Sequence, residues 1–223
     1  MRVTYIQHSC FLVETDRCYY LFDYEEGSLP AMDTEKPILV LSSHGHDDHY
    51  NEEIFPRLAA AGMGQVKAIL SDDIDAPQGV DTLLVSPGKE YMLADRQKLT
   101  TFLSTDLGVA FLIEDGEEII YHSGDLNDWV WEEETEEYNE AMTEKYRLQI
   151  RLLAQTLQGR QIDAAFAVLD PRQEKDYDRG LCYLLETVAA KAVYPMHYWD
   201  DPTVIGRFLK DHPEYGSQVQ RTQ

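Results

Sequence analysis

The most constraining feature of this sequence is a run of three histidines and two aspartates within six positions, residues 44–49, directly after the apolar segment 38–41. Imidazole and carboxylate groups crowded this closely compete for space and for hydration, so a positive charge is needed to hold them together. A divalent metal ion supplies that charge, because zinc and related ions accept neutral imidazole nitrogens and carboxylate oxygens as ligands. The run therefore predicts a metal-binding loop behind a buried strand; a histidine-rich polar loop is the alternative.

The spacing inside this loop indicates more than one ion. His44 and His46 are separated by a single small residue, so both can turn toward one ion while Gly45 lets the backbone pass close by. Asp48 and His49 are adjacent in the chain and must diverge, which places them better for a second ion. This one loop cannot saturate two ions, and further ligands are therefore expected from later parts of the chain.

Length and composition narrow the class of protein. The 223 residues, 43% of them hydrophobic, fit one globular domain over 1–223 that can bury a sizeable core. The net charge of −22 disfavours nucleic acids and anionic membranes as partners, because both repel such a chain at long range. We expect a cytoplasmic location from three scattered cysteines without CxxC spacing, from an N-terminus without a signal-peptide pattern, and from apolar runs too short for a span of about 18 residues.

The order of apolar patterns predicts a mixed fold. Short strands dominate residues 2–23, a strand–helix–strand unit follows, strands dominate 90–123, and helices alternate with strands after that. The one long helical segment is expected at about 132–158, with an apolar stripe made by Tyr138, Met142, Tyr146, Ile150, Leu153 and Leu157. Two mixed halves of similar content predict an α/β (α+β) fold in which two sheets form a sandwich with helices outside.

Two later residues stand where strands are expected to end. Asp125 follows the apolar segment 119–121 with Gly124 beside it, and His197 follows the segment 193–196. Strand ends fix the backbone and let side chains from different strands converge, so both residues are candidate metal ligands. The alternatives are an ordinary Gly-Asp turn and a hydrogen-bonded histidine at the edge of a sheet.

Taken together, these residues resemble the metallo-β-lactamase superfamily. The resemblance rests on the motif His44-x-His46-x-Asp48-His49, on Gly124-Asp125 after a strand and on His197 at a late strand end. It implies a four-layer αββα sandwich with metals at one edge of the sheets. It also implies that His44 and His46 bind a first ion, that Asp48, His49 and His197 bind a second, and that Asp125 lies between the two. The opening segment 7–13 resembles the branch of ascorbate-6-phosphate lactonase-like hydrolases.

The sequence departs from that superfamily at the first ion. The family usually supplies a third histidine between the opening cluster and the bridging aspartate, and here that interval holds only His122, within a predicted strand. Asp106 stands at the expected turn and offers a carboxylate oxygen instead, which would favour manganese or iron alongside zinc. A turn-capping role for Asp106 is the alternative.

The predicted function is metal-assisted hydrolysis of a small, anionic or neutral substrate such as a phosphodiester, lactone or related ester or amide. Asp48 is the candidate for orienting the attacking water, and Arg172, Tyr198 and His8 are candidate substrate residues. One or two divalent ions are expected, with zinc first and manganese or iron as alternatives. The rival interpretation is a degenerate single-metal or non-catalytic binding protein. A redox di-iron protein is weakened because such proteins usually carry an acidic residue where His46 stands, and the sequence predicts no oligomeric state.

Overall fold

The computed structural model describes residues 1–221 and divides into two compact units, Met1–Ser86 (unit 1) and the part that begins at Pro87 (unit 2). Each unit contains one six-stranded sheet with both parallel and antiparallel pairs. Two mixed sheets with helices are the content predicted from the sequence. The single domain over 1–223 stays a prediction.

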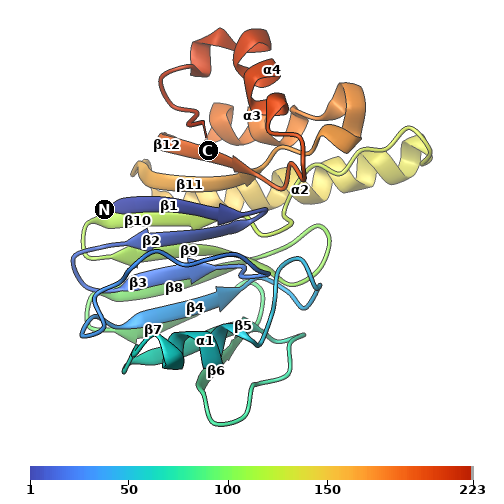
Figure 1. The fold of residues 1–223 in the computed structure, drawn as a ribbon. Helices are drawn as coiled ribbons and strands as arrows, with labels where there is room; N and C mark the ends of the chain where they lie inside the picture. Colours follow the sequence, from blue (N-terminus) through green and yellow to red (C-terminus); the bar gives the residue numbers. More distant parts are fainter. Residues whose placement is uncertain (222–223) are drawn as a thin grey trace. The chain divides into compact units, whose positions relative to one another are not determined.

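Unit 1 combines an antiparallel meander with parallel strands. Strands β1, β2 and β3 pair antiparallel, and β3, β4, β5 and β6 then pair parallel in that order (Figure 1). The parallel pairs require crossovers, and α1 supplies the one between β4 and β5. The elements are β1 (Arg2–Gln7), β2 (Cys10–Glu14), β3 (Tyr19–Phe22), β4 (Ile38–Ser42), α1 (Ile54–Ala60), β5 (Val66–Ser71) and β6 (Asp81–Val85).

The core of unit 1 fixes the strand that precedes the histidine loop. All five residues of β4 are buried, as expected for a central strand with both faces covered. Helix α1 contributes Ile54, Phe55 and Leu58 to a cluster that includes Ile38 and Val40 of β4. Each such side chain stabilises the fold by about 1.5–3 kcal/mol when fully buried, so the loop after β4 starts from a rigid base.

Unit 2 has three antiparallel strand pairs followed by two parallel ones, whereas unit 1 has two antiparallel pairs followed by three parallel ones. Its sheet runs β12-β11-β10-β9-β8-β7, and the pairs β10–β11 and β11–β12 are parallel. Its elements are β7 (Glu90–Ala94), β8 (Gln97–Leu103), β9 (Val109–Asp115), β10 (Glu118–His122), α2 (Glu136–Leu157), β11 (Ile162–Val168), the 3-10 helix η1 (Pro171–Asp176), α3 (Arg179–Thr187), β12 (Ala190–Met196), α4 (Thr203–Asp211) and the 3-10 helix η2 (Pro213–Tyr215).

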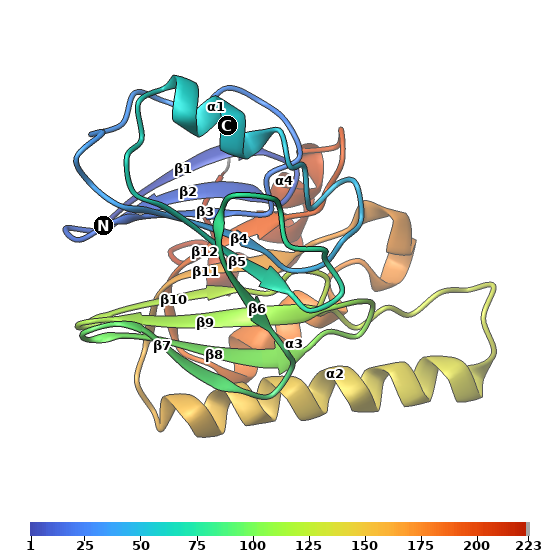
Figure 2. The ribbon, with the colours of Figure 1, turned by 90° about the horizontal axis from the view of Figure 1, so that it is seen from below.

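The long helix α2 begins later than the acidic composition predicted. Thr135 is its N-cap, because the threonine side chain accepts a hydrogen bond from the Tyr138 N–H at 3.2 Å, and residues 132–134 precede the helix. Its remaining stripe residues are buried as expected, whereas Tyr138, in the first turn, is 43% exposed. Figure 2 shows α2 running along the sheet of unit 2, where it packs against α3 and β8.

Strand direction determines where the loops of each unit gather. In unit 1, β1, β3, β4 and β5 run the same way, since two antiparallel steps separate β1 from β3. In unit 2, β8, β10, β11 and β12 share one direction for the same reason. The segments that leave the carboxyl ends of these strands therefore meet at one edge of each sheet, which we call the carboxyl edge of that unit.

Within residues 1–221, no helix combines the length and the apolar character that a transmembrane span requires.

Candidate metal centre

The histidine loop forms a tight turn at the carboxyl edge of unit 1. His44 is fully buried and His46 is exposed, and the Nε2 atom of His44 lies 2.9 Å from the Nδ1 atom of His46. The backbone N–H of His49 closes the turn by donating to the His46 carbonyl at 2.9 Å. The Gly45 N–H donates to Asp73 Oδ2 at 2.8 Å, and a Cβ atom at Gly45 would lie 3.3 Å from that oxygen. The close backbone approach expected at Gly45 is therefore present.

A buried aspartate that the sequence analysis did not single out orders this loop. Asp23 follows β3 and accepts hydrogen bonds from the Ser43 N–H and Ser43 hydroxyl, both at 2.7 Å, and pairs with His49 Nδ1 at 2.7 Å. The Ser43 hydroxyl also lies 3.0 Å from His44 Nδ1. These contacts engage the Nδ1 atoms of His44 and His49, which leaves their Nε2 atoms as the nitrogens able to coordinate a metal. The available signal was a carboxylate at the end of an apolar strand.

A second group of potential ligands in unit 1 comprises His8, Asp48 and His49. The Nε2 atom of His8 lies 3.4 Å from Asp48 Oδ2, and His49 Nε2 lies 3.7 Å from the same oxygen. One donor atom from each residue falls within 4.8 Å of the others. His8 occupies the β1–β2 turn with a left-handed φ of 46°, a conformation that is uncommon for residues other than glycine and that concentrates at functional sites. Sequence reasoning assigned His8 only to the substrate.

At the carboxyl edge of unit 2, hydrogen bonds bring two aspartates together. Asp125 follows β10, and Asp106 lies in the β8–β9 turn with its N–H donating to Ser104 Oγ at 3.2 Å. The Thr105 hydroxyl donates to the Asn127 carbonyl at 2.6 Å and accepts from the Asn127 N–H at 2.9 Å, which links the two segments. A carboxylate oxygen of Asp106 and one of Asp125 lie within 4.8 Å of each other.

His197 completes the candidate ligands of unit 2. It follows β12 with a left-handed φ of 61°, and its Nε2 lies 3.5 Å from Asp125 Oδ1. Its Nδ1 lies 3.1 Å from Asp170 Oδ2, the carboxylate that follows β11. Burial would raise the pKa of Asp170, but hydrogen bonds from His197 and Arg172 outweigh it and lower the pKa to about 2. Asp170 therefore stays ionised and engages His197 Nδ1 as Asp23 engages His49 Nδ1.

A cavity of about 200 Å³ opens beside these ligands within unit 2. Trp129 and Trp131 stack in it with ring centroids 5.8 Å apart, and the Trp129 indole donates to the Asp125 carbonyl at 2.9 Å. Sequence reasoning missed both tryptophans, because they lie in an irregular segment without a motif. The lining residues are Thr105, Asp106, Trp129, Trp131, Tyr138, Met142, Arg172 and His197.

The other predicted substrate residues of unit 2 differ in position. Arg172 lines the cavity, stacks over the Trp199 ring at 4.6 Å and donates Nε to Asp170 Oδ1 and Oδ2 at 3.0 and 2.9 Å. Tyr198 is 3% exposed and is not among the residues that line the cavity.

His122, the histidine between the opening cluster and Asp125, is fully buried in β10, where its Nδ1 accepts a hydrogen bond from the Gly124 N–H at 3.1 Å.

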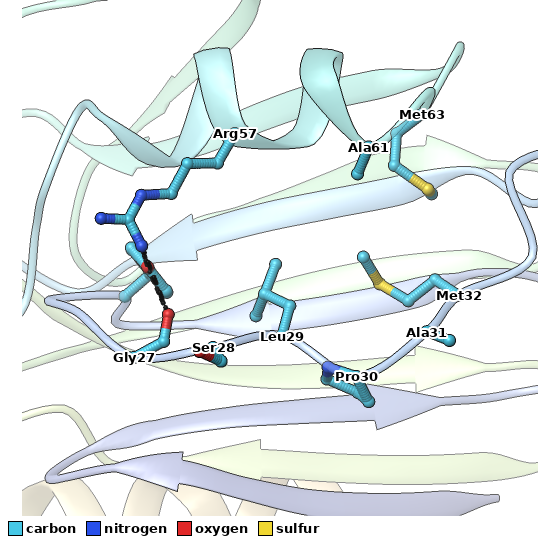
Figure 3. Close-up of a pocket in the computed structure, with 10 residues that line it drawn as sticks. Gly27, Ser28, Leu29, Pro30, Ala31, Met32, Arg57, Ala61 and Met63 are labelled. Carbon is cyan, nitrogen blue, oxygen red and sulfur yellow. Dashed lines mark hydrogen bonds between the residues drawn. The ribbon is translucent and has the colours of Figure 1, made fainter.

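Unit 1 has a larger cavity of about 480 Å³ between α1 and the segment 27–32. Figure 3 shows Arg57 reaching from α1 toward Gly27, and its Nη1 donates to the Tyr24 hydroxyl at 2.8 Å and to the Gly27 carbonyl at 3.4 Å. Ser28 and several leucine, proline, alanine and methionine side chains line the rest. None of the candidate metal ligands lines this cavity, so we do not assign the chemistry to it.

The donor set of each unit fits a divalent metal ion. Unit 1 supplies mainly imidazole nitrogens, and buried oxygen atoms engage the outer nitrogens of two of them. Unit 2 supplies carboxylates with one imidazole whose outer nitrogen faces Asp170. Imidazole with carboxylate is the ligand chemistry of zinc, iron and manganese, whereas calcium and magnesium sites use oxygen ligands.

Comparisons with known proteins agree with the superfamily that the sequence resembles. A family model described as a β-lactamase superfamily domain matches residues 2–141, more than half of the chain. No protein of curated function matches the sequence significantly.

Several solved structures are similar to this chain in fold. Igni18, described as a metallo hydrolase from the archaeon Ignicoccus hospitalis, has a TM-score of 0.67 at 16% identity over 98% of this chain and 93% of its own. CmlA, a diiron β-hydroxylase from Streptomyces venezuelae, gives 0.64 at 13% over 98% and 52%. An isothiocyanate hydrolase from Delia radicum gut bacteria gives 0.58 at 14% over 100% and 97%. Likenesses at this identity show the fold alone, and they confirm the predicted α+β class.

Proposed function

The chain belongs to the β-lactamase superfamily, and from this premise we propose that it is a metal-dependent hydrolase of a small, anionic substrate. The superfamily predicted from the sequence is confirmed, whereas the ascorbate-6-phosphate lactonase branch stays a prediction. A cytoplasmic location likewise stays a prediction.

One observation carries the proposal: three histidines have their outer nitrogen engaged by a buried partner. His44 Nδ1 faces Ser43 Oγ at 3.0 Å, His49 Nδ1 faces Asp23 Oδ2 at 2.7 Å, and His197 Nδ1 faces Asp170 Oδ2 at 3.1 Å. A histidine that binds a metal usually donates its other ring N–H to a carboxylate or another oxygen, which fixes its orientation. Two of these histidines lie in the loop 44–49 and the third follows β12, so the same arrangement occurs in both units.

We assign the ligands in two groups. His44 and His46 would bind the first ion, with Asp106 in the position of the family's usual third histidine. Asp48, His49 and His197 would bind the second ion, with His8 as a further donor because its Nε2 lies 3.4 Å from Asp48 Oδ2. Asp125 would serve both ions. These assignments extend the sequence prediction by His8.

The ions would supply Lewis-acid chemistry, lowering the pKa of a coordinated water and polarising a carbonyl or phosphoryl group. Asp48 is only partly buried, which suits a group that exchanges protons with solvent. A carboxylate oxygen of Asp48 would orient the attacking water and accept its proton. Asp23 and Asp170 would hold the imidazoles in place and take no proton themselves.

The cavity of unit 2 supports a small substrate with an anionic group. A volume of about 200 Å³ accommodates only a small molecule, and stacked indole rings form an apolar wall. Arg172 adds a guanidinium that Asp170 and Trp199 hold in a defined position. A guanidinium fixed in this way pairs with a carboxylate or phosphate oxygen of a substrate.

The rival proposal is a degenerate protein that binds one ion or none and catalyses nothing. It is suggested by the ligands of the first ion, because only two histidines are available there besides carboxylates. The redox alternative gains a fold likeness to a diiron hydroxylase, but His46 still stands where such proteins usually carry an acid.

Metal analysis of protein purified without added ions tests the proposal. We expect Asp125→Ala to lose two equivalents of metal relative to the unchanged chain, because Asp125 would serve both ions. His44→Ala should lose at least the first ion, because His44 would bind that ion. Asp47→Ala, an exposed aspartate of the same loop, is the matched control and should lose none. Loss of a single equivalent in Asp125→Ala, or of none in either variant, would contradict the two-ion site. A panel of phosphodiesters, lactones and amides then tests hydrolysis.

A further inference from the structure

Three other potential metal ligands of unit 2 converge where α3 begins and α4 ends, and the proposed hydrolase chemistry uses none of them. Asp178 immediately precedes α3, and Cys182 lies one turn later on the same face of that helix. His212 immediately follows α4 and donates its N–H to the Phe208 carbonyl at 2.8 Å.

The donor atoms of these residues lie close enough together to surround one ion. His212 Nε2 lies 2.7 Å from Asp178 Oδ2 and 3.6 Å from Cys182 Sγ, and all three donors fall within 4.8 Å of one another. Zinc bond lengths of about 2.3 Å to sulfur and about 2.0 Å to nitrogen or oxygen imply separations of about 3.5 Å for S–N and about 3.3 Å for N–O. The S–N separation agrees with this value, but Cys182 Sγ also lies 4.0 Å from His212 Nδ1, so the sulfur lies beside the ring and not beyond Nε2. Both the imidazole and the Asp178 side chain would therefore have to turn to bind one ion.

The surroundings of Cys182 favour a cation. Burial, together with the carboxylates of Asp178, Glu186 and Glu214, raises the pKa of its thiol to about 12. The side chains of Asp178 and His212 are 22% and 25% exposed, so an ion from solvent can reach their donor atoms. A divalent ion here would offset three negative charges and favour the thiolate.

Nucleophilic catalysis does not explain this cluster. In a Cys-His-Asp triad the thiol and the carboxylate face opposite ring nitrogens. Here the thiol lies 3.6 Å from Nε2 and 4.0 Å from Nδ1 of His212, and the nearer nitrogen is the one that faces Asp178. A thiol whose pKa is raised is also a poor nucleophile. The remaining alternative is a plain ion pair between Asp178 and His212, to which the nearby thiol contributes nothing.

We propose that Asp178, Cys182 and His212 bind a zinc ion that ties α3 to α4, with water as the fourth ligand. The Cys182 thiol loses its proton to solvent as the zinc–sulfur bond forms, and no electrons are transferred. The His212 proton moves to Nδ1, which lies 3.7 Å from Glu214 Oε1 and so gains a nearby acceptor. This site is independent of the proposed hydrolase.

Cobalt(II) titration of the full chain, freed of metal by a chelator, tests this site. Cobalt replaces zinc in such sites, and a cysteine thiolate bound to cobalt gives a charge-transfer absorption that nitrogen and oxygen ligands do not. We expect one equivalent of this absorption in the unchanged protein and none in Cys182→Ser. His212→Gln and Asp178→Asn should weaken the binding that produces it by at least about tenfold.

Two matched controls separate the zinc site from other causes. Asp211→Asn removes a neighbouring carboxylate that bonds Tyr177 and not His212, and it should leave the absorption unchanged. Cys10→Ala removes a buried thiol from β2 and should do the same. Far-UV circular dichroism of each variant confirms that it is folded. An absorption that is absent from the unchanged protein, or that persists in folded Cys182→Ser, overturns the proposal and leaves an ion pair only.

Discussion

Unit 1 and unit 2 place their candidate ligands by the same rule but draw them from very different lengths of chain. In both units the ligands stand at the carboxyl edge, after strands that run in one direction. In both, a buried aspartate after one strand faces Nδ1 of a candidate histidine, namely Asp23 with His49 and Asp170 with His197. The shared construction indicates that strand direction, not a particular loop, brings the candidate ligands of each unit together.

The two units differ in donor chemistry and in access. Unit 1 concentrates four candidate ligands in residues 44–49 and offers mainly imidazole nitrogen. Unit 2 takes Asp106, Asp125 and His197 from three separate strand ends and places the aromatic cavity beside them. We therefore assign tight metal binding chiefly to unit 1 and substrate selection chiefly to unit 2.

Left-handed backbone conformations occur at both carboxyl edges, although not only there. His8 and Asp23 in unit 1, and His197 and Trp199 in unit 2, adopt left-handed φ values between 43° and 61°. Each such conformation at a residue other than glycine costs of order 1–3 kcal/mol and persists where the surroundings enforce it. Strain of this kind collects at active sites, which agrees with the proposed function.

The largest predicted difference between the units concerns the two buried aspartates. Asp23→Asn should lower the free energy of unfolding by about 3 kcal/mol and weaken metal binding about 10–100-fold, because an amide cannot accept all the bonds that Ser43 and His49 direct at Asp23. Asp170→Asn should cost about 1–2 kcal/mol, since its partner Arg172 is half exposed and can be rehydrated. Urea unfolding and chelator competition measure both, and equal losses would contradict the assignment.

Two glycines test packing in the two units. A Cβ atom at Gly180 in α3 would lie 1.9 Å from Asn127 Oδ1, so Gly180→Ala should cost about 2–3 kcal/mol of unfolding free energy. At Gly45 the nearest atom is the Asp73 carboxylate oxygen at 3.3 Å, the end of a side chain that can shift, so Gly45→Ala should cost below about 1 kcal/mol. A larger loss for Gly45→Ala would show that the histidine loop is more tightly packed than unit 2.

Two arginines, one from each unit, test whether the substrate binds in unit 2. Arg172→Ala should raise the KM for an anionic substrate about tenfold, by removing a charge-assisted hydrogen bond. Arg57→Ala is the counterpart in unit 1, where an arginine also lines a cavity and lies over a tyrosine ring at 5.9 Å, and it should leave KM unchanged. Steady-state kinetics on the best substrate of the panel measure both KM values. If only Arg57→Ala raised the KM, the substrate-binding cavity would have to be assigned to unit 1.

The smallest predicted effects should be alike in the two units. Hydrogen bonds and charge from Lys36 and Arg2 lower the pKa of Glu14, and Arg160 and Lys98 lower that of Glu114 against the opposing effect of burial. A lowered carboxyl pKa stabilises the fold above the ordinary value of 4.5 and the gain is lost as the pH falls through the lowered pKa. Glu14→Gln and Glu114→Gln should therefore each cost about 0.5 kcal/mol at pH 7 and nothing at low pH in urea unfolding. A pH-independent loss in either variant would trace its effect to packing.

The sequence by itself determined the fold class and those candidate ligands that lie close together in the chain. Apolar periodicity predicted mixed strands and helices, and residues 44–49 could be recognised because their ligands are neighbours in the chain. Asp125 and His197 were found because a polar side chain directly after an apolar strand is visible in one dimension. His122 could be set aside as a ligand because it lies within a strand.

Only the tertiary structure decided the partners that lie far apart in the chain. Asp23 pairs with His49 across 26 positions and Asp170 with His197 across 27, and no local pattern encodes those pairs. The promotion of His8 to a candidate ligand, and the convergence of Asp178 and Cys182 with His212, likewise depend on which strands and helices pack together. Periodicity reports the direction a side chain takes from its own element, whereas a site depends on distances between elements, and packing sets those distances.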